Sequence, residues 1–156
     1  RSTQGVSSAA SDVYKRQTLY YFASLKNYLV AGTGNKVEDF GVGFYTKYGD
    51  GGVDLSPIAD LLKSQVFNLG KFLNVDKTII NAKPSDGLYD DSRSDEDQIG
   101  ASYDELEWAM NTTESNSKIS DRQKEILKIY RSFNTKNKHK MEPIPICIIP
   151  TDLLTD

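Results

Sequence analysis

Glycines, lysines, hydroxyls and carboxylates are concentrated in one polar segment between residues 31 and 54. The segment has two parts, Ala31-Gly-Thr-Gly-Asn-Lys-Val-Glu-Asp39 and Phe44-Tyr-Thr-Lys-Tyr-Gly-Asp-Gly-Gly-Val-Asp54. Glycine lets a backbone approach phosphate oxygens closely, and lysine neutralises their charge. A carboxylate nearby can hold the Mg²⁺ that accompanies a polyphosphate. The segment therefore predicts a nucleotide-binding site.

The residues before this segment predict the scaffold that positions it. Residues 19–27 carry apolar side chains at helical spacing, and residues 28–31 form a short β-prone run that ends in Gly32-Thr-Gly34. A helix, a buried strand and a glycine turn in succession are typical of an α/β fold. Because ligands of open α/β sheets bind beyond the carboxyl ends of strands, we expect residues 33–39 at the edge of the site.

Three further helices are predicted after the polar segment. A serine followed by proline favours a helix over residues 56–73. Capping boxes at residues 102–105 and 120–123 predict helices that end at Met110 and at about Phe133. The last helix should bury Ile126, Leu127, Tyr130 and Phe133 and expose a solvated basic face of Arg122, Lys124, Lys128 and Arg131.

Residues 81–98 are polar, lack periodicity and contain Pro84 and Gly87. This pattern predicts a long loop of the kind that closes over a site as a lid. Its acidic part, residues 90–97, is interpreted as a solvated loop, because the oxygen spacing and closing glutamate of an EF-hand are absent.

Composition narrows the classes of function. The chain has 156 residues, 38% of them hydrophobic, which is enough to bury a core. A net charge of -3 gives no general attraction to nucleic acid or to an anionic membrane, so we expect neither as a partner. Cys147 is the only cysteine, which excludes an intramolecular disulfide and favours a reducing compartment. With no signal-peptide pattern and no long apolar run, we expect a cytoplasmic location.

The first 17 residues differ from the rest. They are rich in Ser, Ala, Gly and Gln without apolar periodicity, and the first methionine is Met110. We interpret residues 1–17 as a non-native junction or disordered segment and leave them out of the fold. Residues 18–156 are then expected to be the C-terminal part of a single domain within a longer protein.

Three motifs carry a family resemblance. Gly32-Thr-Gly-Asn-Lys-Val-Glu38, Phe44-Tyr-Thr-Lys-Tyr-Gly-Asp-Gly-Gly-Val-Asp54 and His139-Lys140 occur in this order. Over residues 18–150 the sequence resembles the ammonia-dependent NAD synthetases. The resemblance implies an α/β fold in which helices flank a parallel sheet, of the adenine nucleotide alpha hydrolase type (N-type ATP pyrophosphatase), incomplete in this chain. It also implies a homodimer.

The resemblance implies a role for individual residues but no catalytic side chain. ATP would be contacted by Thr33, Lys63 and Ser85, deamido-NAD by Lys47, Asp54, His139 and Lys140, and Mg²⁺ by Glu38. The spacing after Glu38 is one residue longer than in shorter members, which leaves Asp39 as an alternative magnesium ligand. Ser85 stands where threonine is usual and keeps the hydroxyl.

Two parts of the family pattern are absent or altered. The sequence Asp50-Gly-Gly-Val-Asp-Leu55 resembles the phosphate loop S-G-G-x-D-S, but Asp50 would place negative charge where phosphate binds. No copy of the true loop occurs in the sequence. A family arginine that precedes residue 18 has no counterpart at the right spacing, so its role is not assigned to Arg16.

The implied reaction is a two-step ligation. ATP adenylates the nicotinate carboxylate of deamido-NAD, and ammonia then displaces AMP to give NAD.

Two alternatives stay open: another synthetase of the ATP pyrophosphatase type, and an inert nucleotide-binding or dimerising fragment. Taken singly, each motif residue is more often structural. Tyr20, Tyr21 and Trp108 are interpreted as core or interface aromatics.

Overall fold

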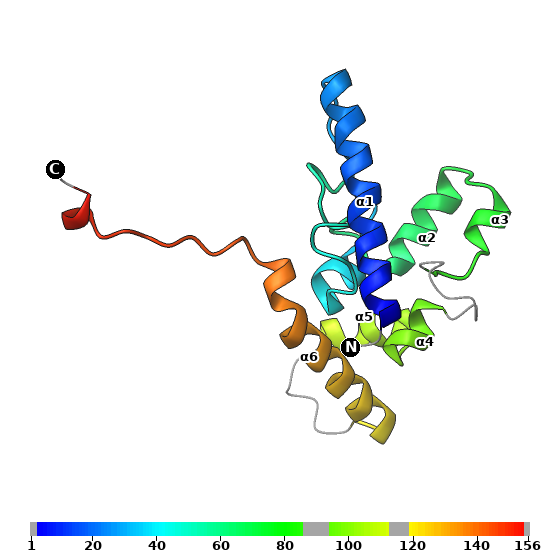
Figure 1. The fold of residues 1–156 in the computed structure, drawn as a ribbon. Helices are drawn as coiled ribbons and strands as arrows, with labels where there is room; N and C mark the ends of the chain where they lie inside the picture. Colours follow the sequence, from blue (N-terminus) through cyan, green and yellow to red (C-terminus); the bar gives the residue numbers. More distant parts are fainter. Residues whose placement is uncertain (1–2, 86–93, 113–118, 155–156) are drawn as a thin grey trace.

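The computed structural model describes residues 3–85, 94–112 and 119–154, and the fold in this part of the chain is helical (Figure 1). No strand is formed among these residues. The elements in order are α1 (Thr3–Lys26), η1 (Lys36–Val42), α2 (Lys63–Phe72), α3 (Lys77–Ile80), α4 (Asp95–Ile99), α5 (Tyr103–Asn111), α6 (Asp121–Met141) and η2 (Thr151–Leu153). η1 is a short π-helical segment and η2 a 3₁₀ turn.

The hydrophobic core lies where η1, α5 and α6 pack against one another. α5 supplies Leu106, which is fully buried, and α6 supplies Ile126. The remaining core residues are Val37, Val42, Ile99, Ala101, Tyr103 and Ala109. The polar segment thus contributes η1 directly to the core, so the predicted site adjoins the best-buried part of the described chain.

Both predicted capping boxes are confirmed. Ser102 accepts from the Glu105 N–H and Ser120 from the Gln123 N–H, at the starts of α5 and α6. The predicted stripe and basic face of α6 are also confirmed, since Ile126 is buried, its apolar neighbours pack on the core and the four basic residues are exposed.

The predicted end of the last helix at Phe133 is wrong, because α6 continues to Met141. Asn134 and Asn137 point at η1 and donate to the carbonyl oxygens of Gly41 and Val42, each at 2.8 Å. These tertiary hydrogen bonds offset the weak helix propensity of asparagine. The extension brings the C-terminal turn of α6 to the polar segment.

The predicted start of a helix at residue 56 is also wrong, since α2 begins at Lys63. Residues 56–61 form turns, and the Leu61 carbonyl accepts a hydrogen bond from the Lys36 N–H at 2.9 Å. That contact holds the chain against η1 before α2 can start. The Gln65 side chain then accepts from the Leu62 N–H at 2.8 Å and closes the helix start.

The strand expected at residues 28–31 is reduced to one parallel bridge between Ala31 and Leu55. The Asp54 N–H donates to the Val30 carbonyl at 2.9 Å, and the Gly32 N–H to that of Leu55 at 2.7 Å. A longer ladder requires neighbouring strands on which to propagate. Among the described residues the two segments pair only with each other.

The predicted loop over residues 81–98 ends earlier than expected. Ser94 caps α4, whose first turn is acidic, and both features favour a helix start. The Asp95 N–H donates to the Pro84 carbonyl at 3.1 Å, which joins the two ends of this stretch. Residues 86–93 lie outside the described residues, so the lid remains a prediction.

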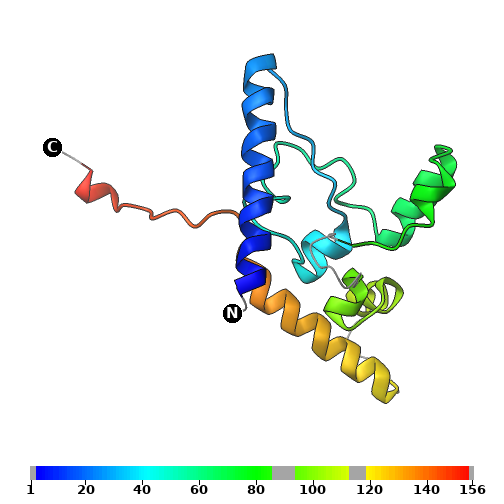
Figure 2. The same cartoon turned by 45° about the vertical axis from the view of Figure 1, so that its right-hand side comes forward.

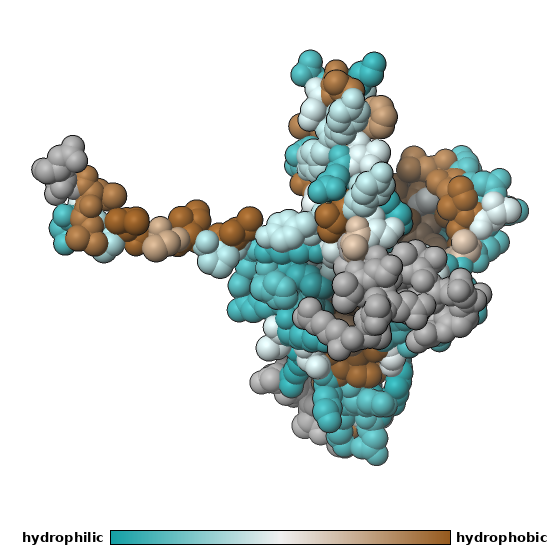
Figure 3. Space-filling view, viewed as in Figure 1, coloured by the Kyte–Doolittle hydropathy of each residue, from teal (hydrophilic) through white to brown (hydrophobic). Residues whose placement is uncertain are grey.

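Residues 3–17, which the sequence analysis left out of the fold, form the first part of α1. None of the described helices is long and apolar enough to cross a membrane. Beyond α6, residues 142–150 extend away from the helices in both views (Figures 1 and 2). Exposed apolar side chains cover this extension and parts of α1 (Figure 3).

Candidate functional site

Asn35 organises the first part of the polar segment. Its side chain is 2% exposed and its Oδ1 accepts hydrogen bonds from the Val37 N–H at 3.0 Å and the Glu38 N–H at 3.2 Å. Asparagine is a preferred N-cap because its oxygen satisfies the free N–H groups of a helix start. The motif therefore fixes the backbone of Glu38 at the first turn of η1.

Glu38 and Lys63, two of the predicted site residues, form an ion pair. Lys63 Nζ lies 2.7 Å from Glu38 Oε1, and both side chains are mostly buried, at 17% and 18% exposure. The Tyr103 hydroxyl donates to the same Oε1 at 2.6 Å. Burial and the charge of Glu38 raise the pKa of Tyr103, so its hydroxyl stays protonated and acts as a donor.

Asp39, the alternative magnesium ligand, lies against the glycine loop. A Cβ on Gly34 would fall 2.0 Å from Asp39 Oδ2, so a larger residue at this position would require the Asp39 carboxylate to move. Desolvation raises the pKa of Asp39 to about 6, and the nearby Glu38 and Asp50 add to the effect. Two carboxylates with different environments therefore stand side by side at the start of η1.

The second part of the polar segment folds into a closed turn. Asp50 Oδ1 accepts from the Thr46 N–H at 2.7 Å, and the Gly51 N–H donates to the Thr46 carbonyl at 3.1 Å. The Asp50 carboxylate thus satisfies a backbone N–H of the same turn. This geometry agrees with the interpretation that the segment is not a phosphate loop.

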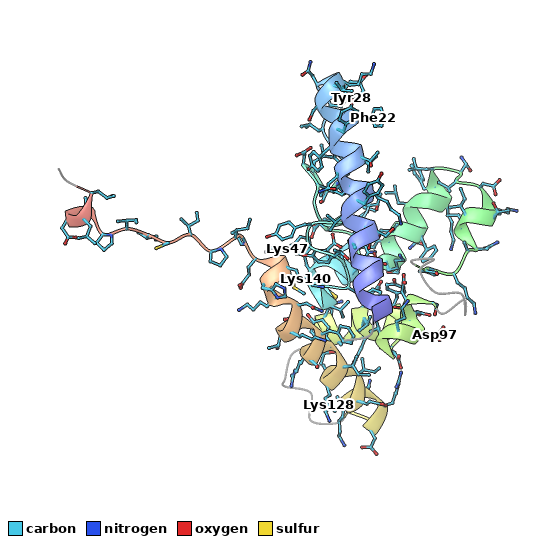
Figure 4. The ribbon with its side chains drawn as sticks, in the orientation of Figure 1. Phe22, Tyr28, Lys47, Asp97, Lys128 and Lys140 are labelled. Carbon is cyan, nitrogen blue, oxygen red and sulfur yellow. The ribbon has the colours of Figure 1, made fainter. Side chains whose placement is uncertain are left out.

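A pocket of about 530 Å³ lies between α1, this turn and the end of α6. Lys47 and Lys140 line it from two sides, and their side chains lie close together near the C-terminal end of α6 (Figure 4). Lys47 Nζ donates to the His139 carbonyl, and Lys140 Nζ donates to the carbonyls of Gly43 at 2.9 Å and Tyr45 at 2.6 Å. Desolvation lowers the pKa of Lys140. Two cations are thus held at the wall of one pocket.

α1 contributes four lining residues that were not predicted as part of the site, and two of them, Arg16 and Tyr20, form hydrogen bonds there. Arg16 Nε donates to the Gly49 carbonyl at 2.8 Å. The Tyr20 hydroxyl donates to Asp54 Oδ1 at 3.0 Å, and Asp54 Oδ2 accepts from the Val30 N–H at 2.8 Å. The spacing of four residues between Arg16 and Tyr20, which places them on one helix face, was the available signal.

The predicted residues thus fall into two groups. Glu38 joins Lys63, whereas Lys47 and Lys140 share the pocket with Tyr20, the partner of Asp54. His139 is exposed, and its backbone oxygen contacts Lys47. Thr33 is exposed on the glycine loop, and Ser85 is exposed next to residues 86–93, which the structure does not describe.

The arrangement suits an anionic small molecule. The pocket is concave, three cationic side chains line it, and a carboxylate paired with lysine lies on the adjoining η1. Within residues 3–85, 94–112 and 119–154, no cluster of three His, Cys, Asp or Glu side chains could by itself hold a metal ion. A concave pocket lined by cations is compatible with a phosphorylated small molecule.

Comparison with known proteins identifies the family to which the chain belongs. The family model described as NAD synthase matches residues 11–144. The chain is 40% identical over 139 residues to the NH(3)-dependent NAD(+) synthetase of Syntrophomonas wolfei, covering 89% of this chain and 52% of that protein. It is 42% identical over 135 residues to the protein of the same name from Archaeoglobus fulgidus, and this match covers 86% of this chain and 52% of that protein. The chain belongs to the NAD synthase family and spans about half the length of the curated relatives it matches.

Solved structures agree with this assignment. The NMN synthetase from Francisella tularensis superposes with a TM-score of 0.80 at 31% identity, over 96% of this chain and 58% of that chain. The NH3-dependent NAD synthetase from Campylobacter jejuni, in complex with nitrate, superposes with a TM-score of 0.70 over 95% of this chain and 58% of that chain. At 24% identity, this match shows a likeness of fold alone.

Proposed function

We propose that the chain belongs to an enzyme that amidates deamido-NAD with ammonia, at the expense of ATP, to give NAD, AMP and pyrophosphate. The observation that carries this proposal is the family match over residues 11–144 together with a pocket that unites Lys47 and Lys140. The pocket would hold deamido-NAD. Lys63 would contact ATP beside Glu38, with Thr33 and Ser85 as further ATP contacts.

The chemistry explains why cations matter more than a nucleophilic side chain. A carboxylate oxygen of nicotinate attacks the α-phosphorus of ATP and pyrophosphate leaves, giving an acyl adenylate. Ammonia then attacks the carbonyl carbon, AMP leaves, and the nitrogen loses a proton. The two substrates are polyanions that repel each other, and fixed positive groups screen this repulsion and stabilise charge at the α-phosphate. Lys47, Lys63 and Lys140 are suited to that task.

The residues present fit a magnesium ion held together with a nucleotide. Glu38 offers a hard oxygen ligand, and its Oε2 accepts no hydrogen bond within the described part of the chain, whereas Oε1 accepts two. Magnesium, when bound, would neutralise phosphate charge. Glu38 is the proposed ligand because it adjoins Lys63, and Asp39 remains the alternative.

Further features are proposed from the family. The parallel sheet flanked by helices would be completed by strands that join the paired segments at Ala31 and Leu55. Residues 18–156 would form the C-terminal part of one domain. A homodimer and a cytoplasmic location are part of the same proposal, and exposed aromatic residues such as Phe22 and Tyr28, which project from one end of α1 in Figure 4, offer surface for assembly.

The Francisella structure favours a second candidate, since that protein is called an NMN synthetase. An enzyme that forms NMN would amidate nicotinic acid mononucleotide. The two substrates share the reacting nicotinate and differ by the adenylate half. The pocket next to Lys47 and Lys140 would bind both through phosphate.

Turnover separates these possibilities. The chain is incubated with ATP, Mg²⁺ and ammonium, with either deamido-NAD or nicotinic acid mononucleotide, and products are quantified by chromatography. We expect NAD and AMP to appear in a ratio of about 1:1 with deamido-NAD, as the two-step ligation requires. Preferential formation of NMN would favour the second candidate. Binding of ATP and deamido-NAD without any product would show that this chain by itself is an inert fragment, and would refute the proposal that it catalyses the reaction alone.

A further inference from the structure

We propose that Tyr103 is a positioning residue, which holds Glu38 through one carboxylate oxygen and leaves the other available to a divalent cation. The inference rests on the proposed function, because it assigns a task within the same ATP site. Neither the sequence motifs nor the family resemblance pointed to Tyr103. In the sequence, Tyr103 stands out only as part of the capping box at residues 102–105.

The position of Tyr103 is fixed by the core. The residue is 6% exposed and opens α5, where its N–H donates to Glu96 Oε1 at 2.7 Å. Its hydroxyl lies 2.6 Å from Glu38 Oε1 and 3.4 Å from Asp95 Oδ2. An ionised carboxylate has no proton to donate, so the single hydroxyl proton goes to the nearer acceptor, Glu38.

Lys63 completes the arrangement from the other side. Its ammonium group lies 2.7 Å from the same Oε1 and 4.8 Å from the centre of the Tyr103 ring. A cation at this distance from an aromatic face is attracted to it, so the tyrosine ring also helps to place the lysine. Both donors thus meet one oxygen, and Oε2 has no hydrogen bond among the described residues.

This pattern restrains the rotation of the carboxylate. The Asn35 cap fixes the Glu38 backbone, and Tyr103 fixes the far end of the side chain. Lys63 alone would be a weaker restraint, because its side chain is flexible and its proposed role is to contact ATP. Partners that orient a metal ligand in this way commonly affect metal affinity about 10- to 100-fold.

The test uses the full chain with Mn²⁺ in place of Mg²⁺ and with ATP present. Enhancement of water-proton relaxation measures the complex of protein, Mn²⁺ and ATP, and calorimetry without metal measures binding of ATP alone. We expect Tyr103→Phe to weaken the metal-dependent complex about tenfold while metal-free binding of ATP changes little. Tyr130→Phe, which removes the hydroxyl of a partly buried tyrosine on α6, is the matched control and should leave both unchanged. A purely structural role would weaken both kinds of binding equally.

The outcomes distinguish the inference from the proposal on which it rests. If Glu38→Gln loses the complex and Tyr103→Phe retains it, Glu38 remains the ligand and the role of Tyr103 is refuted. If Tyr130→Phe weakens binding as much as Tyr103→Phe, the effect comes from packing and the inference also fails. If the wild-type chain gives no enhancement, or Glu38→Gln equals wild type, the metal assignment itself is wrong and the inference falls with it.

Discussion

Asn35→Ala should destabilise the folded chain by about 1–3 kcal/mol. The substitution removes the acceptor for two backbone N–H groups, those of Val37 and Glu38, at a position that is 2% exposed. Loss of an N-cap side chain typically costs about 0.5–2 kcal/mol, and a buried donor without a partner about 1–3 kcal/mol. The two ranges overlap because they describe the same lost hydrogen bonds, so they are not added.

Urea unfolding followed by circular dichroism measures this change. With a slope of about 1–3 kcal/mol per M for a chain of this size, the midpoint should fall by about 1 M. Asn111→Ala is the matched control, because its exposed side chain donates to the Glu107 carbonyl at 2.9 Å from the end of α5. That variant should change stability by less than about 0.5 kcal/mol. Equal midpoints for Asn35→Ala and wild type would refute the idea that the motif asparagine organises η1.

Two further stability predictions follow from local geometry. Gly43→Ala should lower the stability of the fold more than Gly100→Ala. Both glycines have positive φ, at 62° and 83°. However, a Cβ on Gly43 would lie 2.5 Å from the Cβ of Asn137, whereas a Cβ on Gly100 would have its nearest neighbour 3.8 Å away. Thermal unfolding of the two variants checks the order, and equal costs would contradict it. Arg122, together with hydrogen bonds from Ser102, lowers the pKa of Glu105 from 4.5 to about 2, so these contacts stabilise the fold above about pH 4.5 and lose this effect as pH falls towards 2. The melting temperatures of Arg122→Gln and of the wild type should become equal as the pH falls towards 2. A difference that stays constant with pH would contradict the assignment.

Local signals in the sequence predicted the features that depend on neighbouring residues. Ser102 and Ser120 cap helices as expected, because a capping box is complete within four residues. The buried stripe of α6 followed from helical periodicity alone. Glu38 and Lys63 were predicted separately from the family resemblance, and the structure places Lys63 Nζ 2.7 Å from Glu38 Oε1.

Features that depend on distant contacts were not predictable in this way. α6 continues past Phe133 because Asn134 and Asn137 bond to η1, about 90 residues earlier in the chain. Tyr103 reaches Glu38 across 65 residues, and no local pattern signals that contact. The strand predicted at residues 28–31 does not form for a related reason, since β pairing depends on neighbours that lie elsewhere in the sequence.

The pocket lined by Lys47 and Lys140 is the proposed binding site for deamido-NAD. Isothermal titration of the full chain with deamido-NAD tests it most directly, with Lys47→Met as the variant and Lys128→Met, an exposed lysine on α6, as the control. We expect one molecule bound per chain and about tenfold weaker binding for Lys47→Met, equivalent to about 1.4 kcal/mol, with no change for Lys128→Met. Absence of binding to the wild-type chain, or equal affinity of the two variants, would contradict the account.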